Sequence, residues 1–172
     1  DARRRYGSQI DEYVTVDNLE FKTNITAERA EEYGIHVSES ITGDATVLDD
    51  VVGERAFDVV FIDAPCSGLG TLRRHPEIRW RLNPDKIDEF AKTGLALLKS
   101  ASSHVAPGGS IVFSTCTITR AENIDVVKAF LASDEGASFS LAPIGGAPCF
   151  NPALKPGSPD AHFAVRLVKA AE

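Results

Sequence analysis

FDVVFIDAPCSGLGT, residues 57–71, is an apolar run that ends in an acid, a proline, a cysteine and a flexible Ser-Gly pair. Its first seven residues predict a buried strand. A second segment, GSIVFSTCTITRAEN at 109–123, has the same arrangement of a buried strand followed by a cysteine. Cys66 and Cys116 therefore both follow the carboxyl ends of predicted strands, which raises the question of what two such cysteines do together.

Strands and helices alternate along the rest of the chain. Apolar runs predict strands at 13–17, 35–43, 57–63 and 110–115, and the alternating segment HFAVRLVKA predicts an edge or antiparallel strand at 162–170. Helices are predicted over residues 18–34, from Pro84 onward, and through 123–132. This order indicates a single α/β layered domain with a mostly parallel sheet.

Residues that start and stop helices support the first helix. Asn18 is a candidate N-cap and Gly34 is a candidate stop just past the last turn. Leu19, Ile25 and Ala30 supply part of an apolar face between them. We therefore expect these three side chains to face the sheet.

The later helices also begin with recognisable signals. Asn83 can cap a helix that has Pro84 in its first position, where proline is favoured. Further along, Thr119 and Glu122 have the S/T-x-x-E form of a capping box. The APGG segment at 106–109 predicts a turn before the strand that leads to Cys116.

Three acids stand at or just past the ends of predicted strands: Asp17, Asp44 and Asp63. In open α/β sheets, ligands bind at the carboxyl ends of the strands. An acid placed like Asp17 hydrogen-bonds ribose hydroxyls in nucleotide-binding folds, but acids also cap helices after strands. Asp44, in TGDAT, is placed to reach an adenine edge and is equally a turn aspartate. Together with the two cysteines, these acids indicate a site along one edge of the sheet.

Composition narrows the function classes. The 172-residue chain has a net charge of −7 and a pI near 5.1, which argues against binding nucleic acid over its whole surface. Local basic clusters stand at 3–5 and in RRHPEIRWR at 73–81.

No apolar run approaches the ~20 residues of a membrane span, so no membrane association is expected. The three cysteines lack CxxC spacing, which indicates a protein of the reducing cytoplasm. The oligomeric state is not fixed by the sequence.

Several roles are open to the cysteines. Cys116 precedes a predicted helix start, whose partial positive charge favours the nucleophilic thiolate, and the plain alternative is a small buried residue. Cys149, in APCFNP, is interpreted as a structural residue. A zinc site lacks paired ligand spacing, so no metal is expected. A Cys-His hydrolase would draw on His75, His104 or His162, and none of these has a recognisable nucleophile–base setting.

Two long segments, DAPCSGLGTLRRHPEIRW and APGGSIVFSTCTITRAEN, resemble the motifs of the Sun/Nop2/NSUN family of S-adenosylmethionine-dependent RNA cytosine-5 methyltransferases, above all its bacterial ribosomal-RNA branch. The resemblance extends from about residue 13 to residue 170. The ending PDAHFAVRLVK is similar to the family's closing strand, although Ala161 and His162 depart from the usual D-G-F-F pattern. The resemblance implies a class I (Rossmann-like) methyltransferase sheet with an antiparallel C-terminal strand, and S-adenosylmethionine as cofactor.

The resemblance also implies catalytic roles. Cys116, in the TCT motif, would be the nucleophile that attacks C6 of an unpaired cytosine in RNA, with ribosomal RNA as the expected substrate. Cys66, in the DAPC motif, would help to release the enzyme, as the base that removes the C5 proton or passes it on. Asp63 would contact the cytosine ring and lie near the methyl end of the cofactor. The chemistry independently favours two such groups, because C5 is a poor nucleophile and the adduct must later lose its C5 proton.

For the cofactor, the resemblance implies that Asp17 holds the ribose, that Lys22 supports Asp17, and that Asp44 holds the adenine. The family's glycine-rich loop, which reads approximately D-x-C-A-A-P-G-G-K-T, has no counterpart in this sequence. The first strand of the sheet, between the strands that end at Asp17 and Asp63, is therefore expected to be missing. Residues 1–172 are expected to be a partial catalytic domain, the C-terminal part of a longer protein, with weak or no activity alone.

For RNA, the resemblance implies that Arg73, Arg74 and Trp80 contact phosphates or stack on a base. The target base must be unstacked, which favours a single-stranded loop. Two alternatives stay open. One is a non-catalytic RNA-binding remnant, and the other is a DNA cytosine-5 methyltransferase, in which Cys66 of the Pro-Cys pair would be the attacking thiol.

Overall fold

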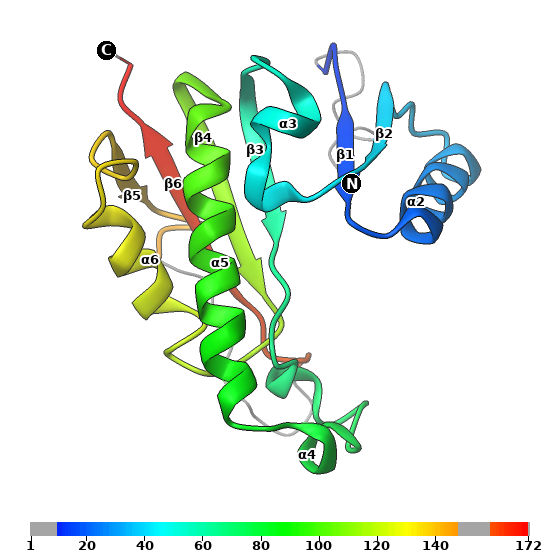
Figure 1. The fold of residues 1–172 in the computed structure, drawn as a ribbon, viewed down its shortest axis with the longest axis vertical. Helices are drawn as coiled ribbons and strands as arrows, with labels where there is room; N and C mark the ends of the chain where they lie inside the picture. The colour runs from blue at the N-terminus through cyan, green and yellow to red at the C-terminus, as the bar shows by residue number, and fades with distance from the viewer. Residues whose placement is uncertain (1–9, 148–158, 172) are drawn as a thin grey trace. The chain divides into compact units, whose positions relative to one another are not determined.

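A computed structural model describes residues 10–147 and 159–171. The basic cluster at 3–5 and Cys149 lie outside the described residues. The contacts divide the chain into two compact units, Asp1–Gly53 and Glu54–Glu172. Each unit has a sheet of its own, and Figure 1 labels the elements of both.

Unit 1 is a small β-α-β layer. Its two strands, β1 (Val14–Asp17) and β2 (Glu39–Thr42), pair in parallel, and α2 (Glu20–Glu32) connects them. Two short helical turns follow β2, namely η2 (Ala45–Val47) and α3 (Asp49–Val52). The elements expected at 13–17, 18–34 and 35–43 are confirmed, with the second strand shorter than expected.

The ends of α2 agree only in part with the sequence pattern. Gly34, with φ of 65°, follows the last turn as expected. At the other end the expected cap is wrong, because Leu19 rather than Asn18 occupies the N-cap position. The expected apolar face is also only partly buried: Ala30 is buried, whereas Leu19 and Ile25 are 40% and 41% exposed.

Unit 2 contains a four-stranded sheet in the order β3–β4–β6–β5. β3 (Phe57–Asp63) and β4 (Val105–Thr115) run parallel, and β6 (Phe163–Lys169) lies antiparallel between β4 and β5 (Phe139–Ala142). The mixed sheet with an antiparallel C-terminal strand is as expected. β5 was not expected from the sequence, and in the structure only its first residue is buried.

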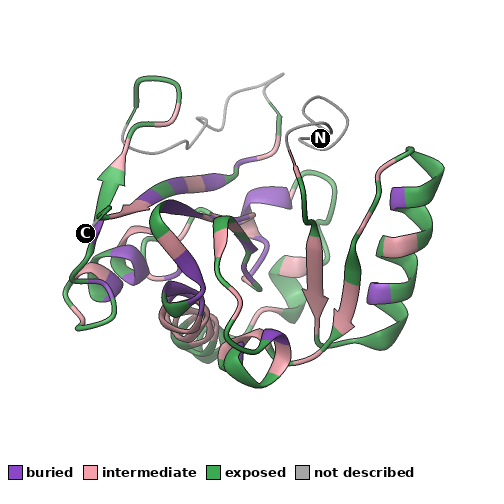
Figure 2. Cartoon of the chain, turned by 90° about the horizontal axis from the view of Figure 1, so that it is seen from above, coloured by how far each residue is buried: buried purple, intermediate pink, exposed green. Residues whose placement is uncertain are grey.

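Two helices cover one face of this sheet. α5 (Asp85–Ser103) and α6 (Ile124–Leu131) pack against each other, and α5 also contacts β4 and β3 (Figure 1). The core between them contains Leu98, Phe113, Val127 and Phe130, all fully buried. Buried residues recur along β6 with the period of two expected for a strand (Figure 2). No described helix has both the length and the apolar character needed to cross a membrane.

The segment between β3 and α5, here called the arm, contains short helical turns. It contains η3 (Leu69–Thr71) and α4 (Ile78–Arg81). α5 itself begins at Asp85, with Pro84 in the N-cap position. The side-chain oxygen of Asn83 accepts the Asp85 N–H at 3.1 Å, so the residue expected to cap does satisfy a donor of the first turn.

The turn expected at 106–109 lies inside β4 rather than before it. Val105 pairs with Phe57 and Ser110 pairs with Val59, so the four residues between them bulge out of the ladder. On the other side, β3 forms an edge of its sheet. It is not the buried strand expected, because only Ile62 is buried and Val59 and Phe61 are 61% and 65% exposed. The strand expected to be missing beside β3 stays a prediction.

Candidate active site

Cys66 and Cys116 meet because their strands are neighbours. β3 and β4 run parallel, and Asp63, the last residue of β3, pairs with Ser114 near the end of β4. Each cysteine follows shortly after its strand, so both lie at the same edge of the sheet. Their Sγ atoms are 3.2 Å apart. The structure thus brings together the two cysteines singled out in the sequence.

The hydrogen bond between the two thiols determines which of them ionises first. Donation from the Cys66 thiol is the largest cause that lowers the pKa of Cys116, which is about 7. Burial and the charges of Asp63 and Glu122 act in the opposite direction. The same hydrogen bond, followed by burial, raises the pKa of Cys66. Cys116 is therefore the first to become a thiolate, which is the nucleophilic form of cysteine.

The cause of this thiolate differs from the one expected. The sequence pointed to a helix start close to Cys116, but α6 begins only at Ile124. Because the charge of a helix end falls off within a turn, the neighbouring Cys66 is the better explanation for the lowered pKa. Cys66 in turn accepts the backbone N–H of Cys116 at 3.3 Å.

Gly70 lies where three backbone segments approach closely. Its N–H donates to the Cys116 carbonyl at 2.9 Å, and its carbonyl accepts the Ala161 N–H at 3.1 Å. A Cβ at position 70 would lie 2.1 Å from the Ala161 carbonyl oxygen and 2.7 Å from that of Cys116. Only glycine fits between these segments, so Gly70 fixes the Cys66 loop against the Cys116 loop.

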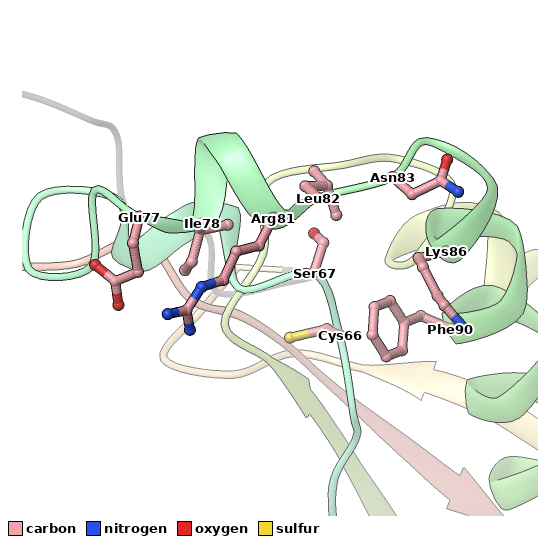
Figure 3. A pocket seen from close by; sticks show the side chains of 9 residues that line it. All are labelled: Cys66, Ser67, Glu77, Ile78, Arg81, Leu82, Asn83, Lys86 and Phe90. Atoms are coloured by element: carbon pink, nitrogen blue, oxygen red, sulfur yellow. The ribbon is translucent and has the colours of Figure 1, made fainter.

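A pocket of about 210 Å³ opens beside Cys66. Figure 3 shows it walled by α4, the residues after α4, and the first turns of α5. Arg81 and Lys86 bring two cationic side chains to it, and Asn83 and Phe90 bring an amide and an aromatic ring. No sequence motif marks Lys86 and Phe90 as binding residues, although their i, i+4 spacing places them on one face of α5.

The three residues expected to contact RNA lie at the surface of unit 2. Arg73 and Arg74 both pair with Asp160, and their side chains are 49% and 63% exposed. Trp80 is 75% exposed, and the guanidinium of Arg79 lies 4.9 Å from the centre of its ring. This region presents both cationic groups and an aromatic face to solvent.

Of the residues expected to bind the cofactor, Asp17, Lys22 and Asp44 belong to unit 1, whereas Asp63 ends β3 in unit 2. Asp17 ends β1 opposite Thr42, the last residue of β2, and Asp44 follows soon after, so both acids lie at one edge of the β1–β2 sheet. Lys22 Nζ is 3.8 Å from Asp17 Oδ2. Asp44 Oδ1 accepts the backbone N–H and the hydroxyl of Thr46 at 2.8 and 2.7 Å, and the backbone hydrogen bond is the first cause that lowers the pKa of Asp44.

In the described parts of the chain, two of the three histidines considered for a Cys-His pair have other partners. Across residues 10–147 and 159–171, no group of three His, Cys, Asp or Glu side chains is arranged to hold a metal ion. His104 is buried, with Nδ1 2.8 Å from the Arg55 carbonyl, and His75 pairs with Glu77 at 3.3 Å. These contacts direct both imidazoles to groups other than the cysteines.

Comparisons with known proteins agree on one family. A family model described as 16S rRNA methyltransferase RsmB/F matches residues 8–148. The ribosomal RNA small subunit methyltransferase B of Klebsiella pneumoniae is 34% identical over 127 residues, which cover 74% of this chain and 30% of that protein. The probable ribosomal RNA small subunit methyltransferase B of Bacillus subtilis is 33% identical over 118 residues, or 69% of this chain and 26% of that protein. The chain thus spans less than a third of the length of these relatives.

Solved structures agree on the fold. The crystal structure of PH0851 superposes with a TM-score of 0.82 at 28% identity and covers 92% of this chain and 37% of that one. NSun6 from Pyrococcus horikoshii, solved with SFG, gives a TM-score of 0.75 at 23% identity, with 94% of this chain and 42% of that chain covered. The fold is that of a class I methyltransferase, as expected from the sequence.

Proposed function

This chain belongs to the 16S rRNA methyltransferase RsmB/F family, and we propose that it carries the catalytic cysteines of an enzyme that methylates C5 of an unpaired cytosine in ribosomal RNA. One observation carries the proposal: Cys66 and Cys116 lie 3.2 Å apart, with one thiol that ionises readily and one that keeps its proton. Such a pair suits a reaction in which one group adds to the substrate and a second group helps it to leave.

Cys116 begins the reaction in this proposal. Its thiolate forms a bond from Sγ to C6 of the cytosine, and the π electron pair of the C5–C6 bond becomes available at C5. S-adenosylmethionine, when bound, would supply an electrophilic methyl group at its sulfonium. Asp63, at the end of β3, is proposed to contact the cytosine ring, because its charge already acts on Cys116.

Cys66 ends the reaction. Once Sγ of Cys116 is bonded to C6, it no longer carries the charge that holds the proton on Cys66. Cys66 can then release its proton to water, while the N–H groups of Gly68 and Cys116 stabilise its thiolate. This thiolate takes the proton from the methylated C5. The C5–C6 double bond re-forms, and the Sγ–C6 bond breaks to return Cys116 as a thiolate.

The acids of unit 1 fit a nucleoside. Asp17 and Asp44 place carboxylate acceptors at one sheet edge, which suits the hydroxyl donors of a ribose and the amino group of an adenine. We propose that Asp17 holds the ribose with support from Lys22, and that Asp44 holds the adenine. Because the sequence has no counterpart of the family's glycine-rich loop, we propose that these 172 residues alone bind S-adenosylmethionine weakly. Isothermal titration that gives micromolar binding to this chain would refute that.

The RNA strand is proposed to run over the arm between β3 and α5. Arg73 and Arg74 would contact phosphates and Trp80 would stack on a base, since all three are accessible. The pocket beside Cys66, with Arg81 and Lys86, would take the strand next to the target cytosine.

Trapping with RNA that contains 5-fluorocytosine tests the proposal. A full-length protein that contains this chain is incubated with the RNA and S-adenosylmethionine, and the cross-linked peptide is mapped by mass spectrometry. A fluorine at C5 cannot leave as a proton, so the adduct should persist at Cys116. A cross-link at Cys66 would contradict the assigned roles and favour the chemistry of the DNA enzymes. RNA binding without any cross-link would favour a non-catalytic RNA-binding protein.

A further inference from the structure

Glu122 is a carboxylate in the interior of unit 2, where it is only 2% exposed. Burying a carboxylate is costly unless its oxygens accept hydrogen bonds. Glu122 accepts the N–H of Ser67 at 2.6 Å and its hydroxyl at 2.8 Å. It also accepts the hydroxyls of Thr119 at 2.5 Å and Thr117 at 3.2 Å. Four donors thus converge on a group that can only accept when ionised.

These donors lie next to the two cysteines. Ser67 directly follows Cys66, and Thr117 directly follows Cys116. The hydroxyl oxygens of Ser67 and Thr117 are themselves 2.7 Å apart. Glu122 therefore connects the two loops through the residue adjacent to each thiol.

Asn123 holds the Cys116 loop in a second way. Its side-chain oxygen accepts the Thr115 hydroxyl at 2.6 Å, and its amide group donates to the Thr117 carbonyl at 3.0 Å. Thr115 and Thr117 are the residues on either side of Cys116. The buried side-chain amide of Asn123 thus bridges the two residues that flank Cys116. The neighbouring Glu122 carboxylate joins this loop to the loop that contains Cys66.

Helix capping does not explain these contacts. In a capping box the Glu122 carboxylate would accept the Thr119 N–H. Only the other half of the box is present, with the Glu122 N–H donating to the Thr119 hydroxyl at 3.3 Å. The Thr119 N–H is directed to the Thr117 hydroxyl at 3.5 Å, and the carboxylate turns to Ser67 instead. α6 starts later, at Ile124.

We propose that Glu122 is a positioning residue for the two-cysteine reaction, which holds Cys66 within hydrogen-bond distance of Cys116 by binding Ser67 and Thr117. The catalytic meaning of this role rests on the proposed function, whereas the hydrogen-bond geometry does not. A purely electrostatic role makes the opposite prediction, because the negative charge of Glu122 opposes ionisation of Cys116.

The Glu122→Ala variant separates the two roles. Without the carboxylate, a looser Cys66 donates less well to Cys116, so the pKa of Cys116 rises above about 7. We expect alkylation of Cys116 by iodoacetamide at pH 7 to slow by about five-fold, since only the thiolate reacts. The rate is followed against pH by mass spectrometry of the Cys116 peptide. The other charged group that acts on Cys116, Asp63, and the hydrogen-bond donor Cys66 both keep their side chains in this variant.

Two further variants sharpen the result. Glu122→Gln keeps an acceptor oxygen without the charge. We expect its pH profile of Cys116 alkylation to lie much closer to that of the unaltered protein than the profile of Glu122→Ala does. Asp125→Ala is the matched control, because it removes an exposed acid of α6 that pairs with Arg120 at 3.3 Å, and its profile should not change. If Glu122→Ala shows no cooperative thermal unfolding, and so is not folded, Ser67→Ala replaces it in the experiment. Ser67→Ala removes the hydroxyl that contacts both Glu122 and Thr117.

A pKa of Cys116 that is lowered or unchanged in folded Glu122→Ala would overturn the positioning role. Where Ser67→Ala replaces that variant, an unchanged pH profile of Cys116 alkylation would overturn it too. The alkylation needs neither RNA nor S-adenosylmethionine, so its outcome does not depend on methyl transfer. Conversely, failure of the 5-fluorocytosine trap would refute the proposed function and leave the hydrogen-bonding role of Glu122 intact.

Discussion

Cys66 and Cys116 lie 50 positions apart in the sequence, yet their Sγ atoms are separated by only 3.2 Å. At this distance the protonation state of each thiol depends on the other, so the two cysteines titrate as a pair. A substitution at either position therefore changes the chemistry of the other.

Replacing Cys66 by alanine should raise the pKa of Cys116 from about 7, because the largest cause that lowers it is lost while burial and the charge of Asp63 remain. Less Cys116 is then thiolate at pH 7, and alkylation by iodoacetamide should slow several-fold, with the whole profile moved to higher pH. Cys66→Ser keeps a donor on a shorter side chain, so we expect its pKa for Cys116 to lie between those of the unaltered protein and Cys66→Ala. An unchanged profile in Cys66→Ala would show that Cys66 does not control the ionisation of Cys116.

Replacing Gly70 by alanine should abolish methylation by moving the Cys116 loop. The new Cβ would lie 2.1 Å and 2.7 Å from two backbone oxygens, which cannot yield as a flexible side chain can. Methyl transfer in the full-length protein and the melting temperature should both fall. Gly34→Ala is the control. The φ of 65° at this position makes alanine lower the stability of the fold by about 1 kcal/mol, but no atom lies within 4 Å of the new Cβ. Equal activity in both variants would contradict the close packing at Gly70.

Replacing Phe113 by alanine should destabilise the chain by about 3–5 kcal/mol, because the ring is fully buried between the sheet and α5 and its loss leaves a cavity. Phe61, which is 65% exposed on β3, is the matched control, and Phe61→Ala should cost well under about 1 kcal/mol. Denaturant unfolding measures both. Similar losses for the two variants would mean that Phe113 does not anchor the core.

Replacing Arg74 by alanine should weaken RNA binding by the full-length protein at low salt. If Arg74 contacts a phosphate, the slope of log affinity against log salt should decrease by roughly one. Arg29→Ala removes an equally charged, exposed residue of α2 and should leave the slope unchanged. An unchanged slope for Arg74→Ala would show that Arg74 pairs with Asp160 and does not contact a phosphate.

The strands that lead to the site could be predicted because their patterns are strong. Residues 57–63 and 110–115 are short apolar runs with turn signals at their ends, and the segment HFAVRLVKA at 162–170 has an alternating pattern. Parallel neighbours present their carboxyl ends on one edge, so the approach of Cys66 and Cys116 followed from the strand assignments. β5 and the bulge at 106–109 could not be predicted, because both depend on pairing with strands distant in the sequence.

The contacts of the site were less predictable than its location. Thr119 and Glu122 have the pattern of a helix cap, and the sequence alone cannot reveal that Ser67, 55 positions away, competes for the carboxylate. Asn18 likewise had the right side chain for a cap, but the carboxylate that ends β1 accepts the Leu19 N–H at 3.0 Å. The competing group is local at Asn18, where Asp17 lies two positions before Leu19, whereas at Glu122 it is a partner that only the folded chain supplies.

The arm that follows Gly70 is tied down at both ends. Gly70 bonds to the Cys116 carbonyl, and Asn83 bonds to the first turn of α5. We therefore expect that exchanging residues 72–82, which lie between these two ties, for the corresponding segment of a relative would leave the two sulfurs in place. Such a transplant would separate the choice of RNA from the methyl-transfer chemistry, and would let one pair of cysteines serve substrates of different shape.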